Sequence, residues 1–309
     1  MPSYRPATAA DVALAVRAGE LATPGHPHPF ADEVELFWEY SDALGPTRRW
    51  VVDEIGLLSV NREGEEPHAW VELDLPADAP TGEWAAVYDF AVTQAGELGA
   101  AEAVAEVWAD QAAAITALEG GGWERRRVDR FWRLELQPAR ERLRSQLEEA
   151  LERLQGVGLA VRPASELGGE EVYRALWKIH EITQPDIPRS VAFVPEPFDV
   201  WKGWMSAPRV LPERVWVGLT AGERPVGYSY LAFRSNGLVE TGYTCLLREA
   251  RGAGLARAMK LASLSQAAEL GVEAAETDND SENAPIIHLN QSLGYQEIVG
   301  RLAFHKPVA

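Results

Sequence analysis

The amino-acid sequence predicts an α/β protein with mixed sheets, built as two related domains in tandem. Residues 4–8 (YRPAT) recur as residues 161–165 (VRPAS), 157 positions further along the chain. A second pair closes each half, where residues 118–123 (LEGGGW) correspond to residues 291–295 (QSLGY). The first pair predicts a strand leading into a helix, and the second predicts a helix end and a glycine turn. A chain of 309 residues accommodates two domains of about 150 residues each.

Strands frame each half of the chain between these matches. A tryptophan-led apolar strand follows the opening of each half, at residues 50–52 (WVV) and 216–218 (WVG). Each half also ends in a strand, over residues 128–136 and 297–305. Hairpins early in each half and a crossover late in it indicate a mixed sheet.

Residues 138–155 (PARERLRSQLEEALERLQ) predict a helix that connects the halves. Proline at 138 suits the first turn of a helix, and Gly156 with Gly158 ends it. One apolar stripe follows the positions i, i+4, i+8 and i+11: Leu143, Leu147, Leu151 and Leu154. We expect this stripe to pack against one or both domains.

Composition excludes several classes of protein. No apolar run approaches the roughly 20 residues of a membrane helix, and the N-terminus lacks the pattern of a secretory signal. A single cysteine, Cys245, excludes an internal disulfide, so we expect a cytoplasmic protein. His26-Pro27-His28 lacks a third ligand at a familiar spacing, so no metal site is expected.

The formal net charge of −18 limits the partners. Such a field repels nucleic acid and anionic lipid, and it favours a cationic ligand. Acidity can also serve solubility alone, so the charge does not identify the ligand. The sequence leaves a monomer and a homodimer equally open.

The second half contains a strand that enters a glycine turn and then a helix. Residues 237–247 (GLVETGYTCLL) are rich in β-formers, and residues 255–270 are almost all strong helix formers. Between them lies Arg251-Gly252-Ala253-Gly254. Free backbone N–H groups at a helix N-terminus, together with the helix dipole, suit a phosphate group. Glycine lets the backbone approach such a ligand closely.

The pattern downstream makes this turn specific. A strand over residues 272–277 and a helix over residues 284–293 follow it, and Gly294-Tyr295 closes the unit. Arg251, Gly254 and Ala256 match the Arg/Gln-x-x-Gly-x-Gly/Ala turn of the GCN5-related N-acetyltransferases (GNATs), which the last 70 residues resemble. Asn283, Asn290 and Gly294-Tyr295 also fit the spacing of that family.

The resemblance implies a binding site for acetyl-CoA as co-substrate, without a metal. The backbone of Thr244, Cys245 and Leu246 would pair with the pantetheine arm. The turn and the first helical residues would wrap the pyrophosphate: Arg251, Gly252, Ala253, Gly254, Leu255, Ala256 and Arg257. Asn283 would contact the cofactor from the next helix, although asparagine also favours a helix N-cap.

The expected reaction is direct attack of an amine on the thioester of acetyl-CoA, which needs a base and a proton donor for the thiolate. Glu240 is the candidate base by resemblance to histone-modifying members, with a solvent-facing strand glutamate as the alternative. Many members carry the acid as a tyrosine four residues before the Gly-Phe/Tyr pair, a position held here by Asn290. Tyr295, His288 or Tyr243 could replace it, or the thiolate leaves unaided; Tyr295 is also a candidate core residue.

The first half is expected to have lost the cofactor site. Aligned on its closing Trp123, residues 84–92 (WAAVYDFAV) take the place of the cofactor strand, and residues 103–110 that of the strand after it. Only ten residues separate these two segments, which leaves no room for a phosphate turn with its helix. The turn pattern is also missing, since residues 93–99 read TQAGELG. The GNAT family includes such tandem forms with one degenerate half.

These observations predict a degenerate GNAT-like domain at 1–137, a connecting helix at 138–157 and an acetyl-CoA-binding GNAT domain at 158–309. The expected function is N-acetyltransfer from acetyl-CoA to a primary amine, with a small molecule favoured. The alternative is a catalytically inactive acetyl-CoA sensor or interaction module. His180, Glu181 and Asp186 are candidates for the acceptor wall, or else for an ordinary helix end.

Overall fold

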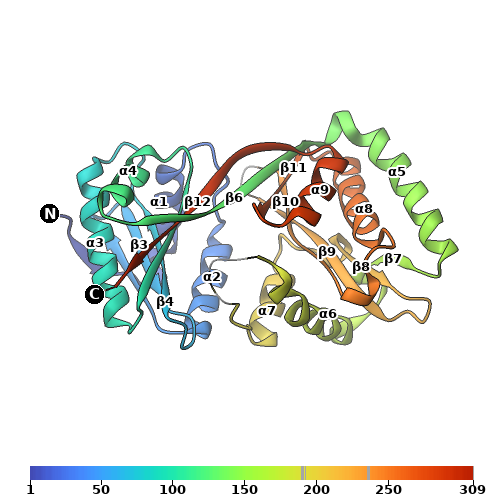
Figure 1. Ribbon diagram of the computed structural model, residues 1–309, viewed down its shortest axis with the longest axis horizontal. Helices are drawn as coiled ribbons and strands as arrows, with labels where there is room; N and C mark the ends of the chain where they lie inside the picture. Colours follow the sequence, from blue (N-terminus) through green and yellow to red (C-terminus); the bar gives the residue numbers. More distant parts are fainter. Residues whose placement is uncertain (189–190, 192, 235–236, 309) are drawn as a thin grey trace. The chain divides into compact units, whose positions relative to one another are not determined.

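The structure is a computed structural model that describes residues 1–188, 191, 193–234 and 237–308 (Figure 1). The chain divides into two compact units. Unit 1 comprises Met1–Arg130, Arg189–Glu196 and Val299–Ala309, and unit 2 comprises Phe131–Pro188 and Pro197–Ile298. Both units combine helices with a sheet of parallel and antiparallel strands, which confirms the predicted mixed α/β class.

Unit 1 has the following elements: β1 (Tyr4–Pro6), η1 (Ala9–Asp11), α1 (Val12–Ala22), α2 (Ala31–Leu44), β2 (Thr47–Val52), β3 (Gly56–Asn61), β4 (His68–Asp74), α3 (Thr81–Glu97), β5 (Glu102–Trp108) and α4 (Ala112–Gly120). Two strands start in one unit and end in the other, β6 (Glu124–Glu135) and β12 (Gln296–Pro307). In unit 1 the strand order is β1-β2-β3-β4-β5-β12, with β4 and β5 parallel and the other described pairs antiparallel.

Unit 2 has the following elements: α5 (Leu136–Gly156), β7 (Ala160–Pro163), η2 (Ala164–Glu166), α6 (Gly169–Thr183), η3 (Gln184–Asp186), α7 (Phe198–Met205), η4 (Pro212–Arg214), β8 (Val215–Leu219), β9 (Pro225–Phe233), β10 (Val239–Leu246), η5 (Arg248–Ala250), α8 (Leu255–Glu269), β11 (Ala274–Asp280) and α9 (Ala284–Leu293). Its strand order is β6-β11-β10-β9-β8-β7. The crossover from β10 through α8 to β11 makes the parallel pair.

The two units differ from the domains expected from the sequence in where the last strand belongs. Within β12, residues 301–307 pair antiparallel with β5, from Arg301 opposite Trp108 to Pro307 opposite Glu102. Residues 299–309 therefore belong to unit 1, whereas the sequence groups them with residues 158–298. The sequence-based division into domains at 1–137, 138–157 and 158–309 stays a prediction.

Helices cover both faces of the sheet in unit 2 (Figure 1). α8 packs on β8, β9 and β10, and α5 lies along α8. α6 contacts β9 and β10 from the other face, together with α7. We call these two faces the α8 face and the α6 face. None of the described helices is both long enough and apolar enough to cross a bilayer.

The connecting helix α5 forms as predicted, but its buried stripe differs by one leucine. Leu143 and Leu154 are 0% and 1% exposed, whereas Leu151 is 38% exposed. At about 100° per residue, Leu154 returns to within about 20° of Leu143, but Leu151 lies about 80° away. Ala150, seven residues after Leu143, is buried in its place.

The prediction of a strand at residues 84–92 is wrong, because these residues lie within helix α3 (Thr81–Glu97). Trp84, Val87, Tyr88 and Ala91 are all buried, at spacings of three and four residues. That is the period of a helix rather than of a strand. The strand that precedes the crossover in unit 1 is β4, and α3 leads from it to the parallel strand β5.

Candidate functional site

β10 of unit 2 is paired with β11 over a short stretch only. It runs antiparallel to β9 from Val239 to Leu246, with a register shift, but its parallel pairing with β11 covers two residues. Val239 pairs with Ala275, and Glu240 pairs with Glu276. Beyond Glu240, the side of β10 that faces β11 carries backbone groups outside that ladder. We call this part of the strand the open edge of β10.

A bulge interrupts β10 where the open edge begins. The register with β9 shifts between Thr241 and Tyr243, so Gly242 is an extra residue. A Cβ atom at Gly242 would overlap the ring of Tyr230, so any other residue would have to displace that ring. Because strand side chains alternate, the extra residue returns Tyr243 to the face that Glu240 occupies. Sequence reasoning missed this bulge, although a glycine inside a strand pattern is its usual signal.

Backbone alternation determines which groups lie on the open edge. Leu247 donates its N–H to the carbonyl of Val226 in β9 at 2.8 Å. Backbone groups of successive strand residues point to opposite sides, so those of Leu246 and Thr244 face away from β9. Those of Cys245 face β9. Of the three predicted pantetheine-binding residues, Thr244 and Leu246 are thus the two that can offer backbone groups at the open edge.

The turn after β10 is open on its outer side. Gly252 and Gly254 have φ angles of 85° and 87°, in the left-handed region that favours glycine. Apart from the adjoining residues of the chain, no heavy atom in the described part of the protein lies within 4 Å of the Cβ position at either glycine. α8 begins at Leu255, and Ala258 donates to the carbonyl of Gly254 at 3.0 Å. The N–H groups of the first helical turn before Ala258 have no carbonyl one turn earlier in the helix, which suits an anion.

Arg251 supports this turn from within. Its Nε and Nη2 donate to the carbonyl of Leu246 at 3.1 and 3.0 Å, and Nη2 also contacts Asp186 at 2.6 Å. Arg248 pairs with the same carboxylate. Hydrogen bonds from Arg248 and Arg251 lower the pKa of Asp186 to about 2. The predicted phosphate contact of the Arg251 side chain stays untested, whereas its contact with Leu246 fixes the start of the turn.

Aromatic side chains fill the α6 face beside β10. Tyr243 is hydrogen-bonded through its hydroxyl to Thr183 at 3.0 Å, and His180 Nδ1 lies 3.1 Å from the hydroxyl of Tyr228. His180 is 7% exposed and packs near Trp201 of α7. Burial raises the pKa of Tyr228 well above its ordinary value. His180 is therefore part of an interior aromatic cluster, rather than an ordinary surface helix end.

The candidate base Glu240 lies on the same face and is ion-paired. Its Oε2 is 2.9 Å from Nε of Arg234, and each of the two side chains is 21% exposed. Glu276 is its neighbour in β11, and parallel register places the two carboxylates on one face. Glu276 in turn contacts Arg133 at 3.5 Å. The solvent-facing alternative is not the observed environment, because Glu240 is mostly covered.

The other predicted site residues differ in accessibility. Tyr295 is 2% exposed, and burial raises its pKa. Asn290 is fully buried, with Nδ2 donating to Oδ1 of Asn279 at 2.6 Å. Cys245 is buried, which raises the pKa of its thiol to about 12. Asn283 is half-buried at the N-cap position of α9, where its side chain makes no capping hydrogen bond.

Arg257, the last of the predicted phosphate-binding residues, faces α5 and α9. It donates to Ser292 at 2.7 Å and to Gln146 at 3.3 Å. Burial and the nearby charges of Arg153 and Arg142 lower its pKa. These three guanidinium groups concentrate positive charge beside the start of α8, in a chain whose net charge is −18.

Unit 1 has the crossover but a different turn. Residues 75–80 (LPADAP) connect β4 to α3 and contain no glycine and no positive φ angle. Pro76 and Pro80 have no N–H group. Ala77 and Ala79 already donate theirs, to the carbonyls of Leu21 and Pro76. The helix that the sequence suggested to be missing is present as α3. The expectation that the first half lacks the phosphate turn therefore rests on the residues of the turn, which offer few free N–H groups.

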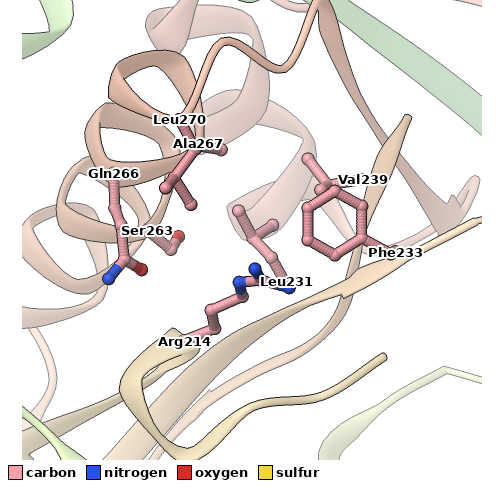
Figure 2. Close-up of a pocket in the computed structure, with 8 residues that line it drawn as sticks. All are labelled: Arg214, Leu231, Phe233, Val239, Ser263, Gln266, Ala267 and Leu270. Carbon is pink, nitrogen blue, oxygen red and sulfur yellow. The ribbon is translucent and has the colours of Figure 1, made fainter. Parts of the chain in front are cut away.

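A small pocket lies on the α8 face of unit 2, away from the turn (Figure 2). Arg214 from η4 enters it beside the strands and stacks on the ring of Phe233, 4.1 Å from its centre. The remaining lining comes from β9, β10 and the second half of α8: Leu231, Val239, Ser263, Gln266, Ala267 and Leu270. None of the predicted site residues lines this pocket.

Solved structures with the same architecture are GNAT proteins. A tandem GNAT protein from the clavulanic acid biosynthesis pathway aligns with a TM-score of 0.73 and 17% identity, over 100% of this chain and 99% of that chain. A GNAT from Sphaerobacter thermophilus aligns with a TM-score of 0.65 and 18% identity, over 99% of this chain and 96% of that chain. The chain therefore has the tandem GNAT fold, as the sequence predicted.

A third similar structure is one region of a longer, multi-domain protein. It is a GCN5-related glucosamine N-acetyltransferase region of a fungal multi-domain GH3 β-N-acetylglucosaminidase, with a TM-score of 0.69 and 11% identity, over 98% of this chain and 38% of that chain. No protein-family model and no curated protein matches the sequence. Within the described residues, no group of three or more His, Cys, Asp or Glu side chains is arranged to hold a metal ion.

Proposed function

We propose that the protein is an N-acetyltransferase that moves an acetyl group from acetyl-CoA to a primary amine, on a small molecule rather than a protein. One observation carries the proposal. The open edge of β10 leads directly into a turn whose two left-handed glycines have no protein atom over them. The strand edge thus leads into the helix N-terminus, so that backbone groups of the edge and N–H groups of the turn lie along one path, which suits a ligand with an amide-containing arm and a pyrophosphate.

The residues present fit acetyl-CoA along this path. The N–H groups from Gly252 to Arg257 would hold the pyrophosphate, and α8 would add its dipole. The pantetheine arm would follow the open edge past Leu246 and Thr244, pairing as an added strand does. The thioester would then lie near Gly242, at the end of the open edge.

Glu240 supplies the proton acceptor in this proposal. The neutral amine attacks the thioester carbonyl from the α6 face and forms the N–C bond, and Glu240 removes a proton from nitrogen directly or through one water. The ion pair with Arg234, at 2.9 Å, holds the Glu240 carboxylate in place for that step. Collapse of the intermediate breaks the C–S bond and leaves the electron pair on sulfur.

The overall charge of the chain favours a cationic acceptor. The two carboxylates on the α6 face, Glu240 and Glu276, are already paired with Arg234 and Arg133, so they add little net charge. The net charge of −18 would still attract an amine with a second positive group.

Titration calorimetry tests the binding part of the proposal. We expect one acetyl-CoA per chain for the wild type, and no measurable binding for Gly254→Trp, because the side chain would fill the phosphate position. Gly271→Trp is the matched control at the other end of α8, where glycine also has a positive φ and open space. Absence of heat with the wild type, or unchanged affinity in Gly254→Trp, would contradict the proposal.

An inactive acetyl-CoA sensor is the second candidate. It is favoured by the fully buried Asn290 at the usual tyrosine position and by the buried Tyr295. Release of free CoA on screening a panel of mono- and diamines separates the two candidates. Binding without CoA release from any amine would favour the sensor.

A further inference from the structure

α8 carries a lysine into the core of unit 2. Lys260 is 1% exposed. Its Nζ donates to Oγ1 of Thr241 at 3.4 Å and lies 5.5 Å from the centre of the Tyr295 ring. Among the described residues it has no ion-pair partner. This side chain plays no part in the turn or in the predicted set of site residues.

Burial of such a group opposes folding. An ammonium removed from water without a carboxylate partner is unfavourable, and burial lowers the pKa of Lys260 to about 7, while the charge of Asp278 in β11 acts in the opposite direction. Thr241 and Tyr295 are the other polar groups that face it. Buried ionisable groups with strongly shifted pKa values are concentrated at functional sites.

The position of Lys260 connects it with the reacting end of the open edge. Thr241 is the first residue of β10 beyond the pairing with β11, and it directly precedes the bulge. Neighbouring strand residues point to opposite faces, so Glu240 serves the α6 face while Thr241 meets Lys260 on the α8 face. The two ionisable groups therefore flank the same point of the strand from opposite faces.

The other candidates for the proton donor fit less well. Asn290 carries no ionisable proton, and Tyr295 is a poor acid because burial raises its pKa. His288 is exposed on α9. Tyr243 shares the α6 face with Glu240, on the side from which the amine approaches.

We propose that the Lys260 ammonium, reaching the end of the open edge from the α8 face, donates the proton that the departing CoA thiolate takes up. This step rests on the proposed acetyltransfer. The C–S bond breaks, its electron pair stays on sulfur, and an S–H bond forms as Lys260 becomes neutral. The proton that Glu240 took from the amine leaves to solvent, and Lys260 is protonated again from solvent, so the reaction balances.

Bound CoA itself provides the test, without knowledge of the acceptor. We would titrate the thiol of CoA bound to the wild type and to Lys260→Met, following the ultraviolet absorbance of the thiolate. Lys260 and the bound thiol titrate as a coupled pair, because a thiolate in contact with the amine raises the pKa of Lys260 and keeps it charged while the ammonium favours the thiolate. Thiolate is therefore expected to appear about one pH unit or more lower in the wild type than in Lys260→Met. Ser265→Ala, which removes another buried polar group of α8, is the control and should match the wild type.

The outcomes separate the two proposals. CoA that binds both proteins but titrates at the same pH in both overturns the role of Lys260 and leaves the acetyltransferase proposal standing. Failure of CoA and acetyl-CoA to bind the wild type overturns both. Lys260→Met should remain folded, since it replaces a buried charge with an apolar side chain of similar length, and circular dichroism checks this.

Discussion

Replacement of Lys260 by methionine should make the protein more stable while it removes the proposed proton donor. The pKa of Lys260 falls from 10.5 to about 7 on burial. At 1.36 kcal/mol per pKa unit, this difference of about 3.5 units corresponds to about 5 kcal/mol of destabilisation when the group is charged. That figure is a ceiling, because local relaxation and water penetration reduce the penalty in real proteins. We expect Lys260→Met to gain about 2 to 4 kcal/mol near neutral pH.

The difference in stability between the wild type and Lys260→Met should depend on pH. The pKa in the folded state lies below that in the unfolded state, so between about pH 7 and 10.5 the unfolded chain binds more protons. The stability of the wild type should therefore rise with pH through that window, and the gain from Lys260→Met should shrink toward zero. Below about pH 7 the full penalty is present, because the lysine is charged in both states.

Urea unfolding of both proteins between about pH 6 and 10 measures the difference. Ser265→Ala controls for the loss of a buried polar group on the same helix, and its difference in stability from the wild type should not change with pH. A Lys260→Met protein that is less stable than the wild type at neutral pH would refute the reasoning. So would a stability difference that is flat across the pH range, because the effect would then be one of packing alone.

Three further predictions concern the neighbouring groups. Glu240→Gln should lower kcat by about 100-fold while the Kd for acetyl-CoA is unchanged, measured by CoA release and calorimetry; full activity would exclude Glu240 as the base. Arg234→Gln should lower kcat/KM while the Kd for acetyl-CoA is unchanged, because Glu240 loses the partner that holds its carboxylate; an unchanged kcat/KM would mean that the pair is not catalytic. Cys245 should resist thiol reagents in the native protein and react once unfolded, since burial raises the pKa of its thiol to about 12; rapid native labelling would contradict this.

The second half was predictable because several independent signals agree there. The turn at Arg251 to Ala256 and the following strand and helix lie within a few residues of their expected bounds. The misread segment of the first half shows the opposite case. Residues 84–92 contain aromatic and β-branched side chains that favour a strand locally, but their burial repeats every three to four residues. Periodicity should have outweighed propensity, since tertiary packing decides the state of such a segment.

Two features of the site required the structure. α8 is buried on most of its surface, so the sequence shows no polar stripe to which Lys260 could be assigned. Its burial depends on the packing of α8 against β8, β9 and β10, which the sequence of the helix does not show. The bulge at Gly242 likewise depends on the ring of Tyr230 in the neighbouring strand. The glycine at 242 within a strand pattern signals a bulge, but the packing partners of Lys260 and Gly242 have no local sequence pattern.

The two halves share a crossover and differ in the chemistry of the turn that enters it. In unit 2 the turn to α8 has two left-handed glycines, which expose backbone N–H groups at a helix start. In unit 1 the turn to α3 has Pro76 and Pro80, which lack N–H groups, and its alanines use theirs within the protein. Because an anion site at a helix N-terminus consists of free N–H groups, the fold can remain intact while the site is lost. The sheet and helix are therefore weak indicators of function here, and the backbone donors of the turn are the discriminating feature, which is why we expect one acetyl-CoA per chain rather than two.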